Sequence, residues 1–168
     1  MTLIVEDATG NPDAESYSTV AEASTYVAKW HQSAAWDTAS EAEKERALRR
    51  GARFVDSHRF LGARTYSNQA LDWPRVNVGI VDGQLILSDD LPQRIKDATV
   101  EAAIRDVEGV DLLTDTDGGS IRSESKSVGS LQTKTDYAAP KTPGKQFKAI
   151  EALLKPFMAS GKLVRAIA

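Results

Sequence analysis

Cysteine is absent from this sequence, which excludes disulfides, thiolate metal sites and cysteine nucleophiles. It also lacks an HExxH helix motif, an EF-hand loop and a glycine-rich phosphate loop. No apolar run approaches the roughly 20 residues of a membrane span, and the first residues lack the basic and apolar regions of a signal peptide. These absences predict a protein made in a reducing cytoplasm, with no metal, no cofactor and no membrane anchor.

Histidine is scarce as well, and only two side chains of this type are available for acid–base catalysis. His31 lies beside Trp30, and His58 lies in the segment Asp56-Ser57-His58-Arg59. That segment holds Ser, His and Asp, but neighbours on one helix point in different directions and do not converge on a substrate. We therefore expect no catalytic residue and no enzymatic activity.

What the sequence does contain fits a single domain. Its 168 residues are 41% hydrophobic, which is enough for one core. Residues 1–48 hold nine acids and three bases, whereas residues 119–168 hold nine bases and three acids. This asymmetry has two interpretations: opposed surface potentials that serve head-to-tail association or DNA contact, or mutual neutralisation within one fold.

Capping signals and hydrophobic periodicity predict two helices in the first third of the chain. The first has Ser18 or Thr19 as its N-cap, and the second begins with a capping box from Ser40 to Glu43. The residues expected on their buried faces are Val20, Ala23, Val27, Trp30 and Ala34 in the first helix, and Leu48, Ala52 and Val55 in the second.

Two further helices are predicted later in the chain. The third opens at Leu91-Pro92, with Asp89 or Asp90 as its cap. The last opens at Thr142-Pro143, and Pro156 ends or kinks it. Their apolar stripes are Ile95, Ala98, Ala102 and Val107, and Phe147, Ile150, Leu153, Leu154 and Phe157.

Residues 63–90 have strand and turn signals in place of helical periodicity. Asp82-Gly83 predicts a tight hairpin within Ile80–Leu87. The segment Trp73-Pro74-Arg75 is expected to be extended, because the residue before a proline is pushed out of the helical region. We assign Trp73, Pro74 and Arg75 as a structural anchor for residues 63–90. For Arg75 two alternatives stay open, an ion pair across an interface or a plain surface charge.

Polar alternation in residues 121–127 and 131–137 predicts an exposed hairpin arm. Its apolar content is too low for a core strand pair, so we expect contact with another chain to stabilise it.

The fold is therefore predicted to be mainly α with a β-hairpin arm (α+β), a small helical bundle of about four helices. One domain spans 1–168, with an extended segment 1–17, the arm 121–137 and a C-terminal tail 158–168. The loop acids Asp111, Asp115 and Asp117 are expected to be solvated rather than to bind a cation.

Nucleic-acid binding is the main alternative to a purely structural role. Arg122, Lys126 and Lys134 of the arm are placed to contact phosphates. Binding to single strands also needs exposed aromatic rings, and most aromatic residues here lie on apolar helix faces. Tyr66 and Trp73 are the exceptions, and at Trp73 we favour packing against the helices over base stacking.

An ordered set of motifs resembles one family. They are Tyr17-Ser18-Thr19-Val20-Ala21-Glu22-Ala23 followed by Tyr26; Trp36 with Glu43-Lys44-Glu45-Arg46-Ala47-Leu48; Phe54-Val55-Asp56 and Phe60-Leu61-Gly62; and Gln69-Ala70-Leu71-Asp72-Trp73-Pro74-Arg75, the most specific. Over nearly the whole chain this order resembles the head–tail connector (adaptor) proteins of tailed bacteriophages. The same family is also labelled DnaT-like single-stranded-DNA-binding proteins. Thr19 departs from the family pattern, which has valine there.

The resemblance implies a structural virion protein of the phage neck. Copies of such connectors form a ring of about twelve subunits, a dodecamer, by heterologous contacts. The ring binds the portal protein on one side and a tail-stopper or tail-terminator protein on the other. Genomic DNA passes through its lumen during packaging and ejection, without sequence-specific recognition.

The resemblance also implies that the arm and the tail are inter-subunit or portal-binding elements. The residues expected there are Arg122, Lys126, Lys134 and Tyr137 of the arm, and Leu163, Val164 and Arg165 of the tail. A DnaT-like replication protein that binds single-stranded DNA is the first alternative, and a small enzyme is the second.

Overall fold

The computed structural model describes residues 2–113, 123–128, 131–136 and 147–159. Contacts between residues divide the chain into two units. The first, called the body below, comprises Met1–Leu112 and Phe147–Ala168, and the second comprises Leu113–Gln146. The described residues form a small α+β fold, the class predicted from the sequence.

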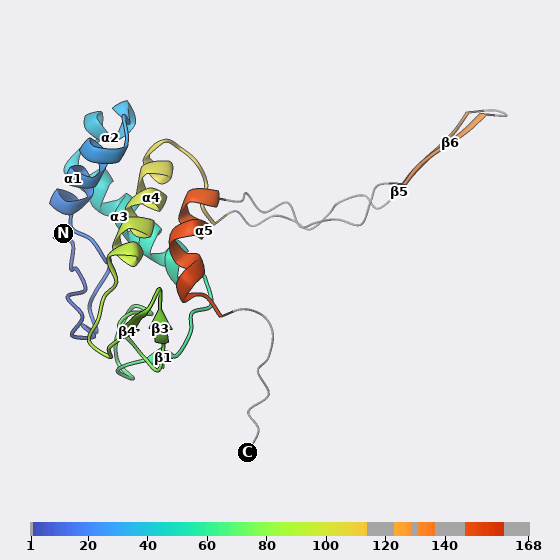
Figure 1. Ribbon diagram of the computed structural model, residues 1–168. Coiled ribbons are helices and arrows are strands. Elements are labelled where there is room, and N and C mark those ends of the chain that lie inside the picture. Colours follow the sequence, from blue (N-terminus) through green and yellow to red (C-terminus); the bar gives the residue numbers. More distant parts are fainter. Residues whose placement is uncertain (1, 114–122, 129–130, 137–146, 160–168) are drawn as a thin grey trace, which may run out of the picture. The chain divides into compact units, whose positions relative to one another are not determined.

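Helices dominate the body, and short two-stranded sheets complete it. The helices are α1 (Val20–Trp30), α2 (Ala34–Thr38), α3 (Glu41–Asp56), α4 (Gln93–Val107), α5 (Lys148–Leu154) and the 3-10 helix η1 (Lys155–Phe157). In Figure 1, α1 and α2 lie at one end of the body and the small sheets lie at the other. Helix α4 packs against both α3 and α5.

The starts of α1 and α3 follow from reciprocal capping. The Thr19 hydroxyl accepts from the Glu22 amide at 3.1 Å, while the Glu22 carboxylate accepts from the Thr19 amide at 2.8 Å. Ser40 and Glu43 form the same box at α3. Each box satisfies backbone donors that an uncapped helix leaves free. Both predicted helix starts are confirmed.

Close packing of α3 on α4 centres on a glycine. A Cβ at Gly51 would lie 2.6 Å from the Thr99 carbonyl oxygen, so any larger residue forces the helices apart. The predicted faces Leu48, Ala52 and Val55, and Ile95, Ala98 and Ala102, are buried. The core consists of two clusters of buried side chains, and both α3 and α4 contribute residues to each cluster. The first holds Tyr17, Phe60, Trp73, Ile150 and Phe157, and the second holds Ala23, Val27, Trp36 and Val100.

Two short antiparallel sheets lie between α3 and α4 in the chain. Strand β1 (Ala63–Arg64) pairs with β2 (Arg75–Val76), and β3 (Gly79–Val81) pairs with β4 (Gln84–Ile86). Both turn residues of the second pair have positive φ, 50° at Asp82 and 82° at Gly83. Such angles suit a two-residue hairpin turn that matches the strand twist. The predicted hairpin is confirmed.

The second unit contains a hairpin of its own. Strand β5 (Ser123–Val128) pairs antiparallel with β6 (Leu131–Asp136) in a sheet of two strands. These strands fall inside the arm predicted at 121–137. The pairing therefore matches the prediction, while the contact of the arm with another chain stays a prediction.

Four expectations about the helices need correction. Trp30 was placed on a buried face, yet it is 71% exposed. Helix α2 was not predicted. Pro92 occupies the N-cap of α4 without a side-chain cap bond, whereas Asp90 accepts from the Leu87 amide. Helix α5 begins at Lys148, five residues later than predicted, and residues 142–143 lie outside the described residues.

Candidate functional site

Trp73 lies at the centre of the body and has no exposed surface. Its ring meets Phe60 edge-on at 5.8 Å between centroids and Phe157 at 5.5 Å. The Trp73–Pro74 peptide bond is cis. A base has no access to this ring, so stacking on nucleic acid is excluded at Trp73. The side chain instead packs between Phe60 and Phe157 of η1, as a structural anchor would.

Arg75 acts as an internal clamp. Its guanidinium donates to the carbonyl oxygens of Leu61 at 2.7 Å, Gly62 at 3.0 Å and Asp72 at 3.1 Å. The residue is only 8% exposed. The alternative of a plain surface charge is wrong, because the residue is buried and donates within the chain, while an ion pair across an interface stays a prediction. The planar fork of arginine suits this triple contact.

A buried hydroxyl–carboxyl pair joins the N-terminal segment to the anchor. The Tyr17 hydroxyl donates to Asp56 Oδ1 at 2.5 Å and accepts from the Trp73 amide at 3.0 Å. The Asp72 amide donates to Asp56 Oδ2 at 3.1 Å. Burial raises the pKa of Asp56 to about 7, against the lowering effect of the Tyr17 hydrogen bond. Every hydrogen bond here is internal, so the pair serves the fold.

Both histidines have structural partners. His31 Nε2 lies 2.7 Å from Glu101 Oε1, and His58 Nδ1 lies 3.0 Å from the Phe54 carbonyl oxygen. Burial of Glu101 raises its pKa, but hydrogen bonds from Arg105, His31 and Tyr26 outweigh it and leave the pKa below its ordinary value. No group of three metal-ligating side chains occurs among the described residues.

Trp30 is the exposed aromatic that the sequence analysis missed. It ends α1 beside a groove of about 580 Å³ between α1 and α4, which Tyr26, Lys29 and Asp97 also line. The sequence signal that was missed is the end of the helix: α1 stops at Trp30. The next helix, α2, places Trp36 in the second core cluster, where Trp30 was expected. The groove offers the flat ring of Trp30, the cation of Lys29 and the nearby carboxylates of Glu22 and Asp97. This chemistry suits a protein side chain or a nucleobase.

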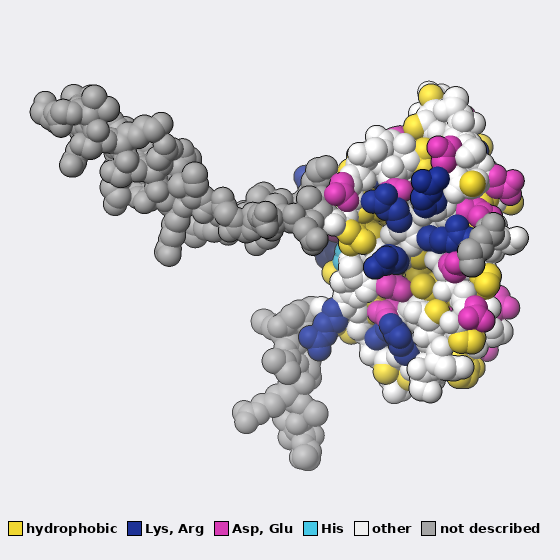
Figure 2. Space-filling model, turned by 180° about the vertical axis from the view of Figure 1, so that it is seen from behind, with side chains coloured by type: hydrophobic (Ala, Val, Ile, Leu, Met, Phe, Trp, Pro, Cys, Tyr) yellow, Lys and Arg dark blue, Asp and Glu magenta, His cyan; other side chains and the backbone are white. Residues whose placement is uncertain are grey.

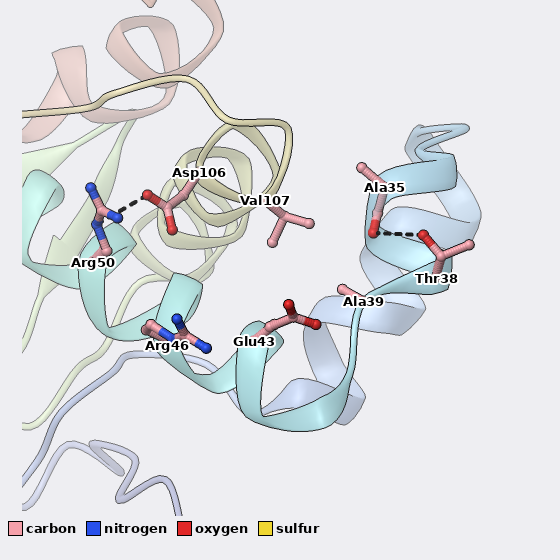
Figure 3. A pocket seen from close by; sticks show the side chains of 8 residues that line it. All are labelled: Ala35, Thr38, Ala39, Glu43, Arg46, Arg50, Asp106 and Val107. Carbon is pink, nitrogen blue, oxygen red and sulfur yellow. Dashed lines mark hydrogen bonds and ion pairs between the residues drawn. The ribbon is translucent and has the colours of Figure 1, made fainter.

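A second groove, of about 440 Å³, lies where α2, α3 and α4 meet. Figure 3 shows Arg46 and Arg50 of α3 beside Glu43 and Asp106, with Arg50 Nε 3.1 Å from Asp106 Oδ1. Figure 2 shows the same mixture on a larger scale, with Lys and Arg side chains interspersed with Asp and Glu over one face. Phosphate binding at Arg50 would have to displace its ion pair with Asp106.

The outer face of the β3–β4 hairpin is apolar and exposed. Ile80 and Leu85 are opposite each other in the register and are 72% and 63% exposed. Leu87 continues the row at 52%. Sequence analysis assigned the hairpin but not this face, because alternation alone does not say which side the core covers.

The predicted interface residues lie mainly outside the described residues. Arg122, Tyr137, Leu163, Val164 and Arg165 fall there. Lys126 is on β5 opposite Thr133, and Lys134 is on β6 opposite Ser125. The hairpin therefore brings both lysines onto one two-stranded sheet without pairing them directly.

Comparison with known proteins gives one match. A family model described as "Putative DnaT-like ssDNA binding protein" matches residues 1–167. No curated protein and no solved structure matches the chain. Within the described residues, no helix combines the length and the apolar character needed to cross a membrane.

Proposed function

The chain belongs to this family of DnaT-like single-stranded-DNA-binding proteins, and within it we propose that the chain is a non-enzymatic head–tail connector of a tailed bacteriophage. Copies form a ring of about twelve subunits in the virion neck by heterologous contacts. The ring binds the portal protein and a tail-stopper or tail-terminator protein, and DNA passes through its lumen.

The observation that carries this proposal is the separate hairpin unit. Leu113–Gln146 forms a unit of its own, and within its described residues β5 and β6 pair only with each other. An isolated two-stranded hairpin is marginally stable in water, and its outer edges offer unpaired backbone groups to another chain. A unit of this kind is typical of an arm that is completed by assembly.

Four cations of the body are engaged in ion pairs within the chain. Arg50, Arg64 and Arg94 each form an ion pair with an aspartate of the same chain. Lys96 is likewise paired with Glu22 at 3.1 Å. A protein that holds DNA tightly presents unpaired cations to successive phosphates. Each of these four side chains would give up an ion pair on binding a phosphate, which suits a subunit whose contact with DNA is weak and not specific for sequence.

Single-stranded-DNA binding is the second candidate, and the description of the family favours it. The structural feature in its support is Trp30, whose exposed ring lies beside Lys29 and the groove between α1 and α4. Aromatic stacking on a base contributes about 1–3 kcal/mol per base. The connector proposal makes Trp30 a protein contact, because exposed tryptophans are favoured at such interfaces.

Two measurements on the full chain separate the candidates. The first is electron microscopy of the chain mixed with the portal protein of its own phage. The second is titration with oligo(dT) of about 30 nucleotides at low salt, followed by tryptophan fluorescence. Because Trp36 and Trp73 are buried, Trp30 reports binding directly. The double variant Lys126→Glu with Lys134→Glu tests the arm, and Trp30→Ala tests the groove.

The connector proposal predicts rings on the portal, their loss in the arm variant, and a fluorescence signal that oligo(dT) leaves almost unchanged. The opposite pattern is a chain that stays monomeric beside the portal and binds oligo(dT) at micromolar concentration. If Trp30→Ala then removes this binding, the connector proposal is wrong and the second candidate replaces it.

A further inference from the structure

The β3–β4 hairpin carries apolar side chains on both of its faces. Val81 and Ile86 point to the core, where Val81 is buried and Ile86 packs against the first cluster. Residues on a strand alternate between faces, so Ile80, Leu85 and Leu87 share the other side. An antiparallel sheet with one face on the core normally has a polar outer face. Three large aliphatic side chains in that place mark a contact surface.

The charge of the hairpin segment restricts what can cover it. Residues 78–91 contain three acids, Asp82, Asp89 and Asp90, and no lysine or arginine. Asp82 is paired with Arg94 at 2.8 Å, whereas Asp89 is exposed. A partner that carries aliphatic side chains together with positive charge therefore complements this surface.

The C-terminal segment of the same chain has this composition. Residues 160–168 read Ser-Gly-Lys-Leu-Val-Arg-Ala-Ile-Ala, with two bases, no acidic side chain and five aliphatic residues larger than glycine. Backbone groups at the hairpin edges are free for strand addition, since β3 and β4 pair only with each other in the described residues. Strand addition combines main-chain hydrogen bonds with contacts of alternate side chains.

We propose that the outer face of the β3–β4 hairpin binds the C-terminal segment 160–168 of a second copy of this chain. This inference rests on the self-assembly in the proposed function and names one of its contacts. The occupant comes from a second copy because of where the segment leaves the body. Phe157 lines a groove on the core side of the hairpin with Val81 and Ile86, and the Ala159 amide donates to the Arg59 carbonyl at 2.9 Å. Ile80 lies on the opposite face of the hairpin from this groove, so we assign the occupant of that face to a second copy.

The absence of cysteine provides a clean test in the full chain. The variants Leu85→Cys and Leu163→Cys are purified separately, mixed and oxidised with a copper–phenanthroline catalyst in air. The matched control mixes Leu163→Cys with Trp30→Cys, because Trp30 is another large exposed hydrophobic residue. Leu85 is exposed, so its replacement leaves the core intact. A third mixture adds Ile80→Ser to the Leu85→Cys chain.

The proposal predicts a disulfide-linked heterodimer at least threefold above the Trp30→Cys control, and a loss of about half of it with Ile80→Ser. Equal yields with Leu85→Cys and Trp30→Cys would falsify it. A double variant, Leu85→Cys with Leu163→Cys, that closes only within one chain at every concentration also overturns it, since the occupant is then the chain's own tail. If rings form on the portal but this crosslink does not, the inference about residues 160–168 is wrong. The connector proposal is unaffected by that result.

Discussion

Asp56 makes the stability of the body fall as pH rises, which is the opposite of the usual behaviour of a carboxylate. Its pKa is raised from 3.8 to about 7 because burial disfavours the charged form. Between these values the unfolded chain is ionised at Asp56 while the folded chain keeps the proton. The folded state therefore binds more protons, and the free energy of unfolding decreases with pH in this window.

The magnitude follows from the width of the window. Each pKa unit corresponds to about 1.4 kcal/mol. Between about pH 4.5 and pH 7.5, the two pKa values correspond to a loss of about 3 kcal/mol from the free energy of unfolding. The loss is complete only above pH 7, where the folded state also releases the proton.

Asp56→Asn isolates this effect from other titrating groups. Glu15, Glu22 and Glu101 have lowered pKa values and stabilise the fold as pH rises through the acid range, so the wild-type curve alone is a mixture. The variant keeps an oxygen for the Tyr17 hydroxyl but does not titrate. The assay is urea unfolding, followed by circular dichroism, of both chains across this range. The difference in unfolding free energy, wild type minus variant, should fall by about 3 kcal/mol. A difference that stays constant to within about 0.5 kcal/mol would refute the environment described for Asp56.

Three other outcomes are expected. Gly51→Ala lowers the free energy of unfolding by about 1–3 kcal/mol, because the new Cβ meets the Thr99 carbonyl oxygen; urea unfolding with Ala42→Ser as an exposed control checks it, and an unchanged midpoint contradicts it. Arg75→Lys costs about 1–3 kcal/mol in the same assay, since one ammonium cannot serve three separate carbonyl oxygens; stability equal to wild type would mean that the clamp is dispensable. Iodide quenches the fluorescence of Trp30 and spares the two buried tryptophans, so Trp30→Phe removes the quenchable fraction; persistent quenching would show that Trp36 or Trp73 is accessible.

Local signals predicted the parts of the fold that local chemistry decides. The capping boxes at Thr19 and Ser40 and the Asp82-Gly83 turn depend on neighbouring residues only, and all three are present. Trp30 shows where this approach fails. Its helical spacing from Val27 is right, but burial depends on which element covers that part of the helix. The short helix α2 inserts Trp36 into the cluster instead, and five residues are too few for a periodic signal.

Side-chain partners from distant parts of the chain were equally beyond a local analysis. The three acceptors of Arg75 are backbone carbonyls, which carry no residue-specific signature. The pairing of Tyr17 with Asp56 spans 39 residues and depends on how the N-terminal segment crosses α3. The apolar outer face of β3–β4 was visible as residues, but its exposure requires knowing which side faces the core.

The sequence motifs on which the resemblance rests converge on one internal joint. Tyr17 comes from the first motif, Asp56 and Phe60 from the third, and Trp73 and Arg75 from the fourth. In the body these side chains contact one another or the same backbone: Tyr17 bonds Asp56 and the Trp73 amide, Phe60 packs on Trp73, and Arg75 holds Leu61 and Gly62.

A signature made of buried joint residues reports the fold and not what the surface binds. The connector proposal and the single-stranded-DNA-binding alternative are therefore compatible with the same buried residues, and only surface residues can separate them. On this chain those are Trp30, the hairpin β5–β6 and the outer face of β3–β4. Substitutions there should change assembly or DNA binding while leaving urea unfolding of the body unchanged, whereas substitutions at the joint should do the reverse. A joint substitution that abolished assembly at full stability would show that the motifs have a direct role in binding after all.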